Sequence, residues 1–139
     1  KQFSVMLQNR AGSLAALVRF VRAAKVEIIG ISIQDARDAT IVRIVVTDPE
    51  SVSYLFAEKG IAYTSCDLVV VALRESGVGL GACLEALMAA ETNVDFAYSL
   101  MAHPDRQSLV AMHLEDYSFG IDVLVRAGFK ILYQEDLSR

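Results

Sequence analysis

Apolar and polar positions follow a recognisable order along the first part of the chain. Residues Phe3–Leu7 alternate as a strand does, and the apolar residues of Leu14–Val21 recur at helical spacing. Two β-branched stretches follow, Val26–Ile33 and Ile41–Thr47, and both are typical of strands. The pattern therefore predicts a strand, a helix and two further strands.

A second helix and a last strand complete this unit. Asp48 is a suitable helix cap, and Pro49 fits the first helical position because it needs no backbone partner there. Gly60 is expected to end the helix, and Ile61–Ser65 to form a strand. The predicted order is β-α-β-β-α-β, a split βαβ arrangement.

The second half of the chain repeats this order. The expected elements are a strand Leu68–Leu73, a helix Leu80–Ala90, strands Val94–Met101 and Leu109–Leu114, a helix capped by Asp116 and ending at Gly128, and a strand Lys130–Tyr133. Only Cys66 and Asp67 separate the two copies. We therefore predict two domains, residues 1–66 and 67–139, in the α+β class: two ferredoxin-like βαββαβ units with antiparallel sheets packed side by side.

The two copies align at a nearly constant offset. Adding 68 converts Val26 into Val94, Asp48 into Asp116 and Gly60 into Gly128. Upstream the offset is 66, since Leu14 best matches Leu80. This change of offset predicts two extra residues in copy two, near the end of its first helix.

Composition narrows the possible functions. The chain has 139 residues, and 54% of them are hydrophobic, a share that excludes a disordered chain. Its net charge of -4 argues against nucleic-acid binding, which depends on Lys and Arg at phosphates. Its apolar runs are too short to cross a membrane. Lys1 begins a strand pattern rather than a signal peptide, and Cys66 and Cys83 form no CxxC pair, so we expect a cytoplasmic protein without metal or cofactor.

The charge is divided unevenly between the halves. Residues 1–66 carry a net +2 and residues 67–139 a net -6. Either the two halves have differently charged solvated surfaces, or they attract each other across an interface.

The βαββαβ order serves unrelated functions, so residues must decide between them. The third strands, Ile41–Val46 and Leu109–Leu114, lack the aromatics of an RNA-recognition module, and the first loop lacks the cysteines of a metal chaperone. His103 is expected to be solvated and His113 to be packed or exposed, and no Ser–His–Asp or Cys–His spacing indicates a nucleophile. We therefore expect no enzyme activity.

The first loop carries the most informative motif. Leu7-Gln8-Asn9-Arg10-Ala11-Gly12-Ser13-Leu14 resembles the strand-to-helix motif of ACT domains, typically Asn-x-Pro-Gly-x-Leu, with Ala11 in place of the common Pro. Together with the topology and the duplication, this extends the resemblance to a tandem ACT protein over the whole chain. The resemblance implies a regulatory module that binds an amino acid between two paired ACT units.

The chemistry of this loop suits a ligand with a carboxylate. A helix N-terminus offers unpaired backbone N–H groups, Gly12 permits close approach, and Asn9 offers a donor and an acceptor. The candidate ligand-binding residues here are Asn9, Arg10, Ala11, Gly12, Ser13 and Leu14. Alternatively, Asn9 and Gly12 form a turn that binds nothing.

The resemblance also implies residues at the start of the second strand. In serine-sensing relatives an Asn lies there, and the matching positions here are expected to be Glu27 and, in copy two, Asp95, whose carboxylates could hold an α-ammonium group. Tyr98 and Ser99 could line an interface pocket. Alternatively, Glu27 and Asp95 are solvent-exposed acidic residues at the start of a strand, and Tyr98 and Ser99 only pack within their strand.

Copy two departs from the loop motif. Aligned on Leu80, Glu75 replaces Asn9 and Val78 replaces Gly12. We therefore expect copy two to be the weaker loop site or purely structural, so that a bulky residue at Gly12, but no change at Val78, abolishes amino-acid binding.

Two functions from different classes follow. The first is a non-enzymatic sensor of a small amino acid, acting as a homodimer that signals to a regulated enzyme partner by changing the arrangement of its ACT units. The alternative is a ligand-free dimerisation or assembly module.

Overall fold

The computed structural model describes residues 1–8, 12–74, 76–102 and 106–138 of the chain. They form two compact units, Lys1–Cys66 and Asp67–Leu137. Unit 1 contains β1 (Gln2–Gln8), α1 (Ser13–Ala23), β2 (Ile28–Ala36), β3 (Ala39–Val46), α2 (Pro49–Lys59) and β4 (Thr64–Cys66). Unit 2 contains β5 (Val69–Leu73), α3 (Ser76–Ala89), β6 (Val94–Ser99), β7 (Ser108–Leu114), α4 (Tyr117–Arg126), β8 (Lys130–Leu132) and the short α5 (Gln134–Leu137).

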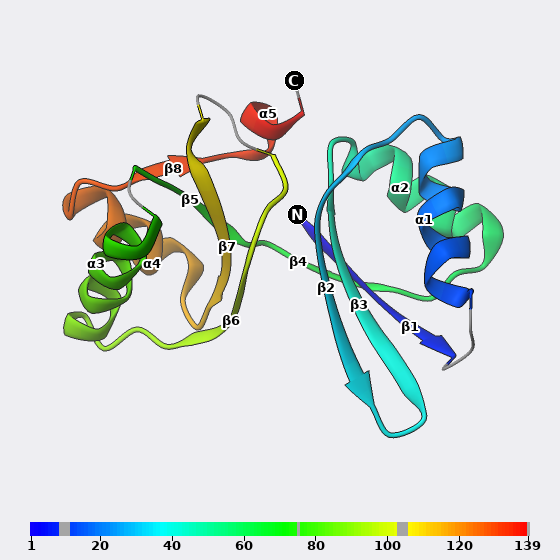
Figure 1. Ribbon diagram of the computed structural model, residues 1–139, viewed down its shortest axis with the longest axis horizontal. Helices are drawn as coiled ribbons and strands as arrows, with labels where there is room; N and C mark the ends of the chain where they lie inside the picture. The colour runs from blue at the N-terminus through cyan, green and yellow to red at the C-terminus, as the bar shows by residue number, and fades with distance from the viewer. Residues whose placement is uncertain (9–11, 75, 103–105, 139) are drawn as a thin grey trace. The chain divides into compact units, whose positions relative to one another are not determined.

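Each unit has a four-stranded antiparallel sheet (Figure 1). The strand order is β2-β3-β1-β4 in unit 1 and β6-β7-β5-β8 in unit 2. The predicted α+β class and the pair of ferredoxin-like βαββαβ units are thus confirmed.

Helices α1 and α2 cover one face of the sheet of unit 1, and α3 and α4 cover one face of the sheet of unit 2 (Figure 1). In unit 1, Phe3 and Val5 of β1 are buried in one core with Leu17 of α1 and Phe56 of α2. In unit 2, the corresponding core is built from alternate residues of β5 and β7 with α3 and α4. This burial of alternate strand residues against helices is the main source of stability in such a unit.

The predicted caps of the second helices are confirmed. Asp48 Oδ1 accepts a hydrogen bond from Ser51 N at 3.1 Å, and Asp116 Oδ1 accepts one from Phe119 N at 3.0 Å. Gly60 ends α2 with φ of 68°, and Gly128, just beyond α4, has φ of 90°. Both backbone conformations favour glycine because it has no Cβ.

The strand pairings correct the alignment of the two copies. Phe3 pairs with Ile44 and Val69 with Met112, so the offset is 66 for the first strands and 68 for the third strands. The offset is also 66 for the second strands. Ile28 pairs with Val46 and Val94 pairs with Leu114, and Val46 and Leu114 match at the offset of 68 of the third strands.

The predicted site of the two extra residues was therefore wrong. A residue with positive φ follows the first helix in each copy, Lys25 in copy one and Glu91 in copy two. Their residue numbers differ by 66, the same offset as in the first strands, so the first helices of the two copies end at matching positions. The extra residues of copy two lie between β6 and β7 instead. Val94 matches Ile28 rather than Val26, and Asp95 does not match Glu27.

Several element ends also differ from the predictions. β2 begins at Ile28 rather than Val26, β4 begins at Thr64 rather than Ile61, and α5 was not predicted. α3 begins at Ser76, well before the expected start at Leu80. Among the described helices, none is long and apolar enough to cross a membrane.

Candidate functional site

The N-terminus of α1 lies where the sequence predicts it. Gly12 precedes the helix with φ of 88° and ψ of -11°, and its carbonyl accepts a hydrogen bond from Ala16 N at 2.9 Å. The first turn of α1 carries no acidic side chain. Such a helix end presents unpaired backbone N–H groups and a partial positive charge to an anion.

The space around Gly12 is open. A Cβ atom added to it would meet no atom of the described structure within 4 Å, so only the left-handed backbone favours glycine there. Ser13 begins the helix, whereas Leu14 is partly buried and packs against the core of unit 1. The other loop candidates, Asn9, Arg10 and Ala11, lie outside the described residues.

Copy two has a different backbone at the corresponding position. The offset of 66 matches Gly12 with Val78, and Val78 lies inside α3 rather than before it. α3 therefore begins before the residue that matches Gly12, and no left-handed glycine lies at that position. The two helix starts thus differ in backbone structure, and the expectation that copy two is the weaker loop site or purely structural stays a prediction.

A groove of about 810 Å³ extends from the start of α1 along β1. One wall is α1, through Ser13, Ala16, Leu17 and Phe20, and the opposite wall is the segment Ile61–Thr64. Between these walls lies the edge of β1 from Ser4 to Gln8. Ile41 and Arg43 of β3 line the groove from the sheet face opposite α1, since they alternate with the core residues Val42 and Ile44. Its volume falls within the roughly 300–1,000 Å³ of typical ligand pockets.

Sequence reasoning found only Ser13 of these groove residues. Ala16 and Phe20 were part of an apolar helical pattern, which predicts core packing and carries no sign of a groove. The groove depends on where β4 separates from β1, and no local motif in the sequence marks that point.

Glu27 lies at the other end of unit 1. Its backbone N–H donates to Thr47 Oγ1 at 3.1 Å, and its carbonyl accepts from Thr47 N at 3.0 Å. Thr47 follows the end of β3 near Gln2, whereas Gly12 follows the opposite end of β1. Because β1 is about 20 Å long, Gly12 and Glu27 of the same unit are not brought together.

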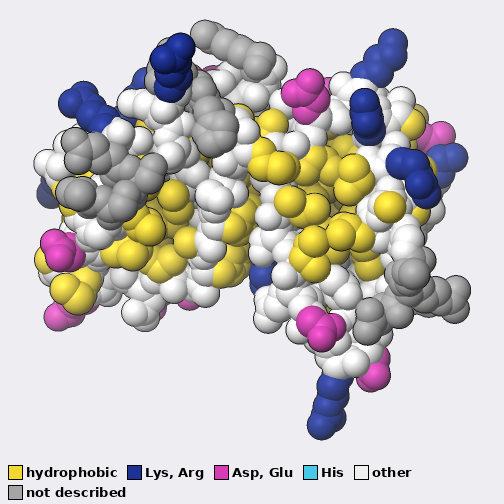
Figure 2. All heavy atoms as spheres, in the orientation of Figure 1, with side chains coloured by type: hydrophobic (Ala, Val, Ile, Leu, Met, Phe, Trp, Pro, Cys, Tyr) yellow, Lys and Arg dark blue, Asp and Glu magenta, His cyan; other side chains and the backbone are white. Residues whose placement is uncertain are grey.

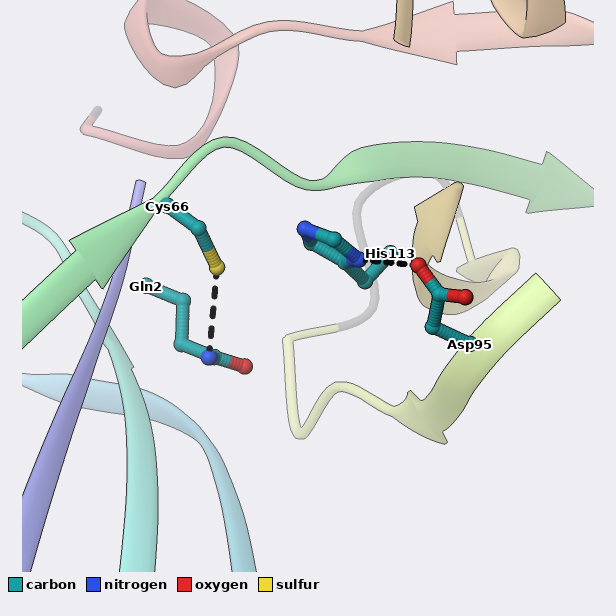
Figure 3. A network of polar contacts seen from close by, with 4 residues as sticks. All are labelled: Gln2, Cys66, Asp95 and His113. Carbon is teal, nitrogen blue, oxygen red and sulfur yellow. Dashed lines mark hydrogen bonds and ion pairs between the residues drawn. The ribbon is translucent and has the colours of Figure 1, made fainter. Parts of the chain in front are cut away.

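Asp95 has a partner within unit 2. Its Oδ2 lies 2.8 Å from His113 Nδ1. Figure 3 shows the two side chains pointing toward each other. The His113 ring in turn stacks on Phe96, with ring centroids 5.1 Å apart. The residue at the position of Glu27 is instead Asn93, whose carbonyl accepts from Glu115 N at 3.1 Å.

Tyr98 and Ser99 also belong to unit 2. Their strand partners are Ala111 and Val110, so the two side chains lie on opposite faces of the sheet. Tyr98 is half-buried and its ring lies 6.4 Å from that of Phe96, while Ser99 is exposed. The candidates thus fall into two groups: Gly12–Leu14 and Glu27 in unit 1, and Asp95, Tyr98 and Ser99 in unit 2.

The two cysteines have different surroundings. Burial raises the pKa of the Cys83 thiol to about 11, so it stays protonated at neutral pH and packs as a small apolar side chain. Cys66 is half-buried, and its Sγ accepts a hydrogen bond from Gln2 Nε2 at 3.4 Å (Figure 3). Within the described ranges, no group of His, Cys, Asp or Glu side chains could hold a metal ion.

Comparison with solved structures shows the same fold in other proteins. Protein BT0572 from Bacteroides thetaiotaomicron is 21% identical, with a TM-score of 0.89 over 99% of this chain and 94% of that one. The regulatory subunit of aspartate kinase from Thermus thermophilus is 12% identical, with a TM-score of 0.61 over 91% of both chains.

A third structure, of aspartokinase alpha and beta subunits, is 15% identical, with a TM-score of 0.58 over 91% of both chains. No curated protein matches the sequence significantly. The model of the ACT domain pair family, however, matches residues 1–138. The topology of both units and this match establish that the chain belongs to the ACT domain family, as an ACT domain pair.

Proposed function

We propose that this ACT domain pair is a non-enzymatic regulatory protein that binds an α-amino acid. The observation that carries the proposal is the start of α1, where the left-handed Gly12 leaves open space beside a helix N-terminus and the groove. An amino-acid carboxylate fits the partial positive charge and free N–H groups of such a helix end.

Signalling would follow from a ligand that prefers one arrangement of the ACT units. We propose a homodimer in which the ligand bound at the start of α1 also contacts an ACT unit of the second chain, and a regulated enzyme as partner. The similarity to the regulatory subunit of aspartate kinase supports a regulatory role. A ligand shifts such an equilibrium only by its difference in affinity between the arrangements.

A thermal-shift screen against the twenty amino acids tests the proposal. We expect at least one amino acid at millimolar concentration to raise the melting temperature, because a ligand that binds only the folded state stabilises it. A melting temperature that none of the twenty raises would overturn the amino-acid sensor and favour the ligand-free assembly module.

Variants of Gly12 locate the site. Gly12→Asn keeps a residue that tolerates the left-handed backbone but adds a side chain beside α1, so we expect it to fold and to lose most of the ligand-induced shift. Gly60→Asn is the matched control, since Gly60 is also left-handed with open space around it. Val78→Ala should leave binding unchanged. Equal losses in all variants would contradict a site at Gly12.

A further inference from the structure

The two units differ where their last strand meets the first. Ser4 pairs with Thr64 in unit 1, and the corresponding pair in unit 2 is Val70 with Leu132. In unit 2 the pairing continues through Val71 with Ile131 and Ala72 with Lys130. In unit 1 it stops at Ser4, so β1 runs on to Gln8 without a described strand along this edge.

The contacts of Tyr63 account for the difference. Its ring packs against Phe3 and Phe56, with centroids 5.3 Å and 5.5 Å away, and its hydroxyl lies 2.9 Å from Ser53 Oγ of α2. These contacts hold the segment before β4 toward α2. The groove of about 810 Å³ lies between this segment, α1 and the edge of β1.

The edge of β1 suits the backbone of a free amino acid. In an antiparallel sheet, alternate residues direct both their N–H and C=O groups to the same edge. Such an edge along Val5–Gln8 can donate to a carboxylate and accept from an α-ammonium group. In unit 2 the matching edge of β5 is occupied, since Ile131 pairs with Val71 and packs on the core.

The walls of the groove determine which side chain fits. Leu17, Phe20, Ile61 and the Tyr63 ring present apolar surface, and Met6, 69% exposed, adds more from the opposite face of the sheet. A small polar side chain would leave this surface wet, whereas each methylene buried there strengthens binding roughly fourfold.

The charge beside the groove favours a ligand without a cationic side chain. Among the described residues that line it, Arg43 alone is charged, and its Nη1 donates to Gln34 Oε1 of β2 at 3.0 Å. This guanidinium gives the groove a positive potential that attracts a carboxylate and repels a lysine or arginine side chain.

We propose that the groove of unit 1 binds α-amino acids with large apolar side chains, with their backbone groups between the β1 edge and the start of α1. The inference rests on the proposed amino-acid sensor and names the class of its ligand. It places the side chain between α1 and Ile61–Tyr63, and replaces the expectation of a small amino acid.

Calorimetric titration of the full chain with glycine, serine, alanine, valine, leucine, phenylalanine and lysine tests the ligand class. We expect affinity to rise from alanine through valine to leucine, by tenfold or more, and serine and lysine to bind more weakly than leucine. Serine or glycine binding more tightly than leucine would overturn this inference while leaving the sensor intact. If no amino acid binds, the proposed function itself fails.

Two alanines of α1 provide a matched pair of variants. Ala15 and Ala16 are both exposed, but only Ala16 lines the groove. Ala16→Phe should fill the groove and weaken leucine binding at least tenfold, while Ala15→Phe should leave it unchanged. Circular dichroism checks that both variants fold. The same affinity in both would exclude the groove.

Ligand analogues test the backbone contacts. Leucinamide lacks the carboxylate and 4-methyl-2-oxopentanoate lacks the ammonium group, so both should bind at least tenfold more weakly than leucine. Arg43→Gln should reduce the preference for leucine over leucinamide, whereas Arg19→Gln on the exposed face of α1 should not. Equal binding of all three compounds would contradict pairing with the β1 edge.

Discussion

Single residues at helix ends determine much of this structure. Asp48 accepts hydrogen bonds from both the backbone N–H and the hydroxyl of Ser51. These two bonds favour the ionised carboxylate, so the pKa of Asp48 is lowered, first by the hydroxyl and then by the backbone N–H. Asp48 and its counterpart Asp116 were predictable, because a cap needs only a local pattern.

The lowered pKa of Asp48 predicts a pH dependence of stability. The stabilisation is present above the ordinary aspartate pKa of about 3.9 and is lost as pH falls through the lower folded-state pKa. Asp48→Asn keeps an acceptor for the cap but cannot titrate. Urea unfolding from pH 6 to pH 3 should show a smaller loss of stability in Asp48→Asn than in the natural protein. Parallel losses would contradict this role.

At the scale of elements, the order and type of every element except the short α5 were predictable, but the register of the strands was not. Val26-Glu27 and Val94-Asp95 look alike in sequence, yet Ile28 and Val94 are the residues that match. Both second strands contain an irregularity at the same place, between Ile28 and Gly30 and between Val94 and Phe96. Such an extra residue shifts a strand's register, and a local hydrophobic pattern does not reveal it.

The groove shows the same limit. Its width depends on the contacts of Tyr63 with Phe3 and Phe56. Phe3 lies far from both other residues in the sequence, so no local pattern reveals this cluster. Ser13 could be predicted because it belongs to the loop motif, whereas Ala16 and Phe20 required the structure.

The aromatic cluster around Phe56 yields a prediction for α2. Phe56 is fully buried and its ring lies 5.8 Å from that of Phe3. Phe56→Ala should lower the free energy of unfolding by about 3–5 kcal/mol, as measured by urea denaturation. Tyr54→Ala, on the same helix but 73% exposed, should change it by less than about 0.5 kcal/mol. Similar effects of the two substitutions would contradict this packing.

For the whole molecule, the two units have the same topology but differ at the start of the first helix and at the edge of the first strand. Unit 1 has the glycine turn before α1 and an open β1 edge, while unit 2 has a helix at Val78 and a longer pairing of β5 with β8. The proposed division is therefore one ligand-binding unit and one structural unit in each chain.

The number of ligands bound per chain tests this division most directly. Calorimetric titration of the full chain with the amino acid that most raises its melting temperature should give one ligand per chain, and Gly12→Asn should remove it. Two ligands per chain, or one that persists in Gly12→Asn, would contradict a single site in unit 1.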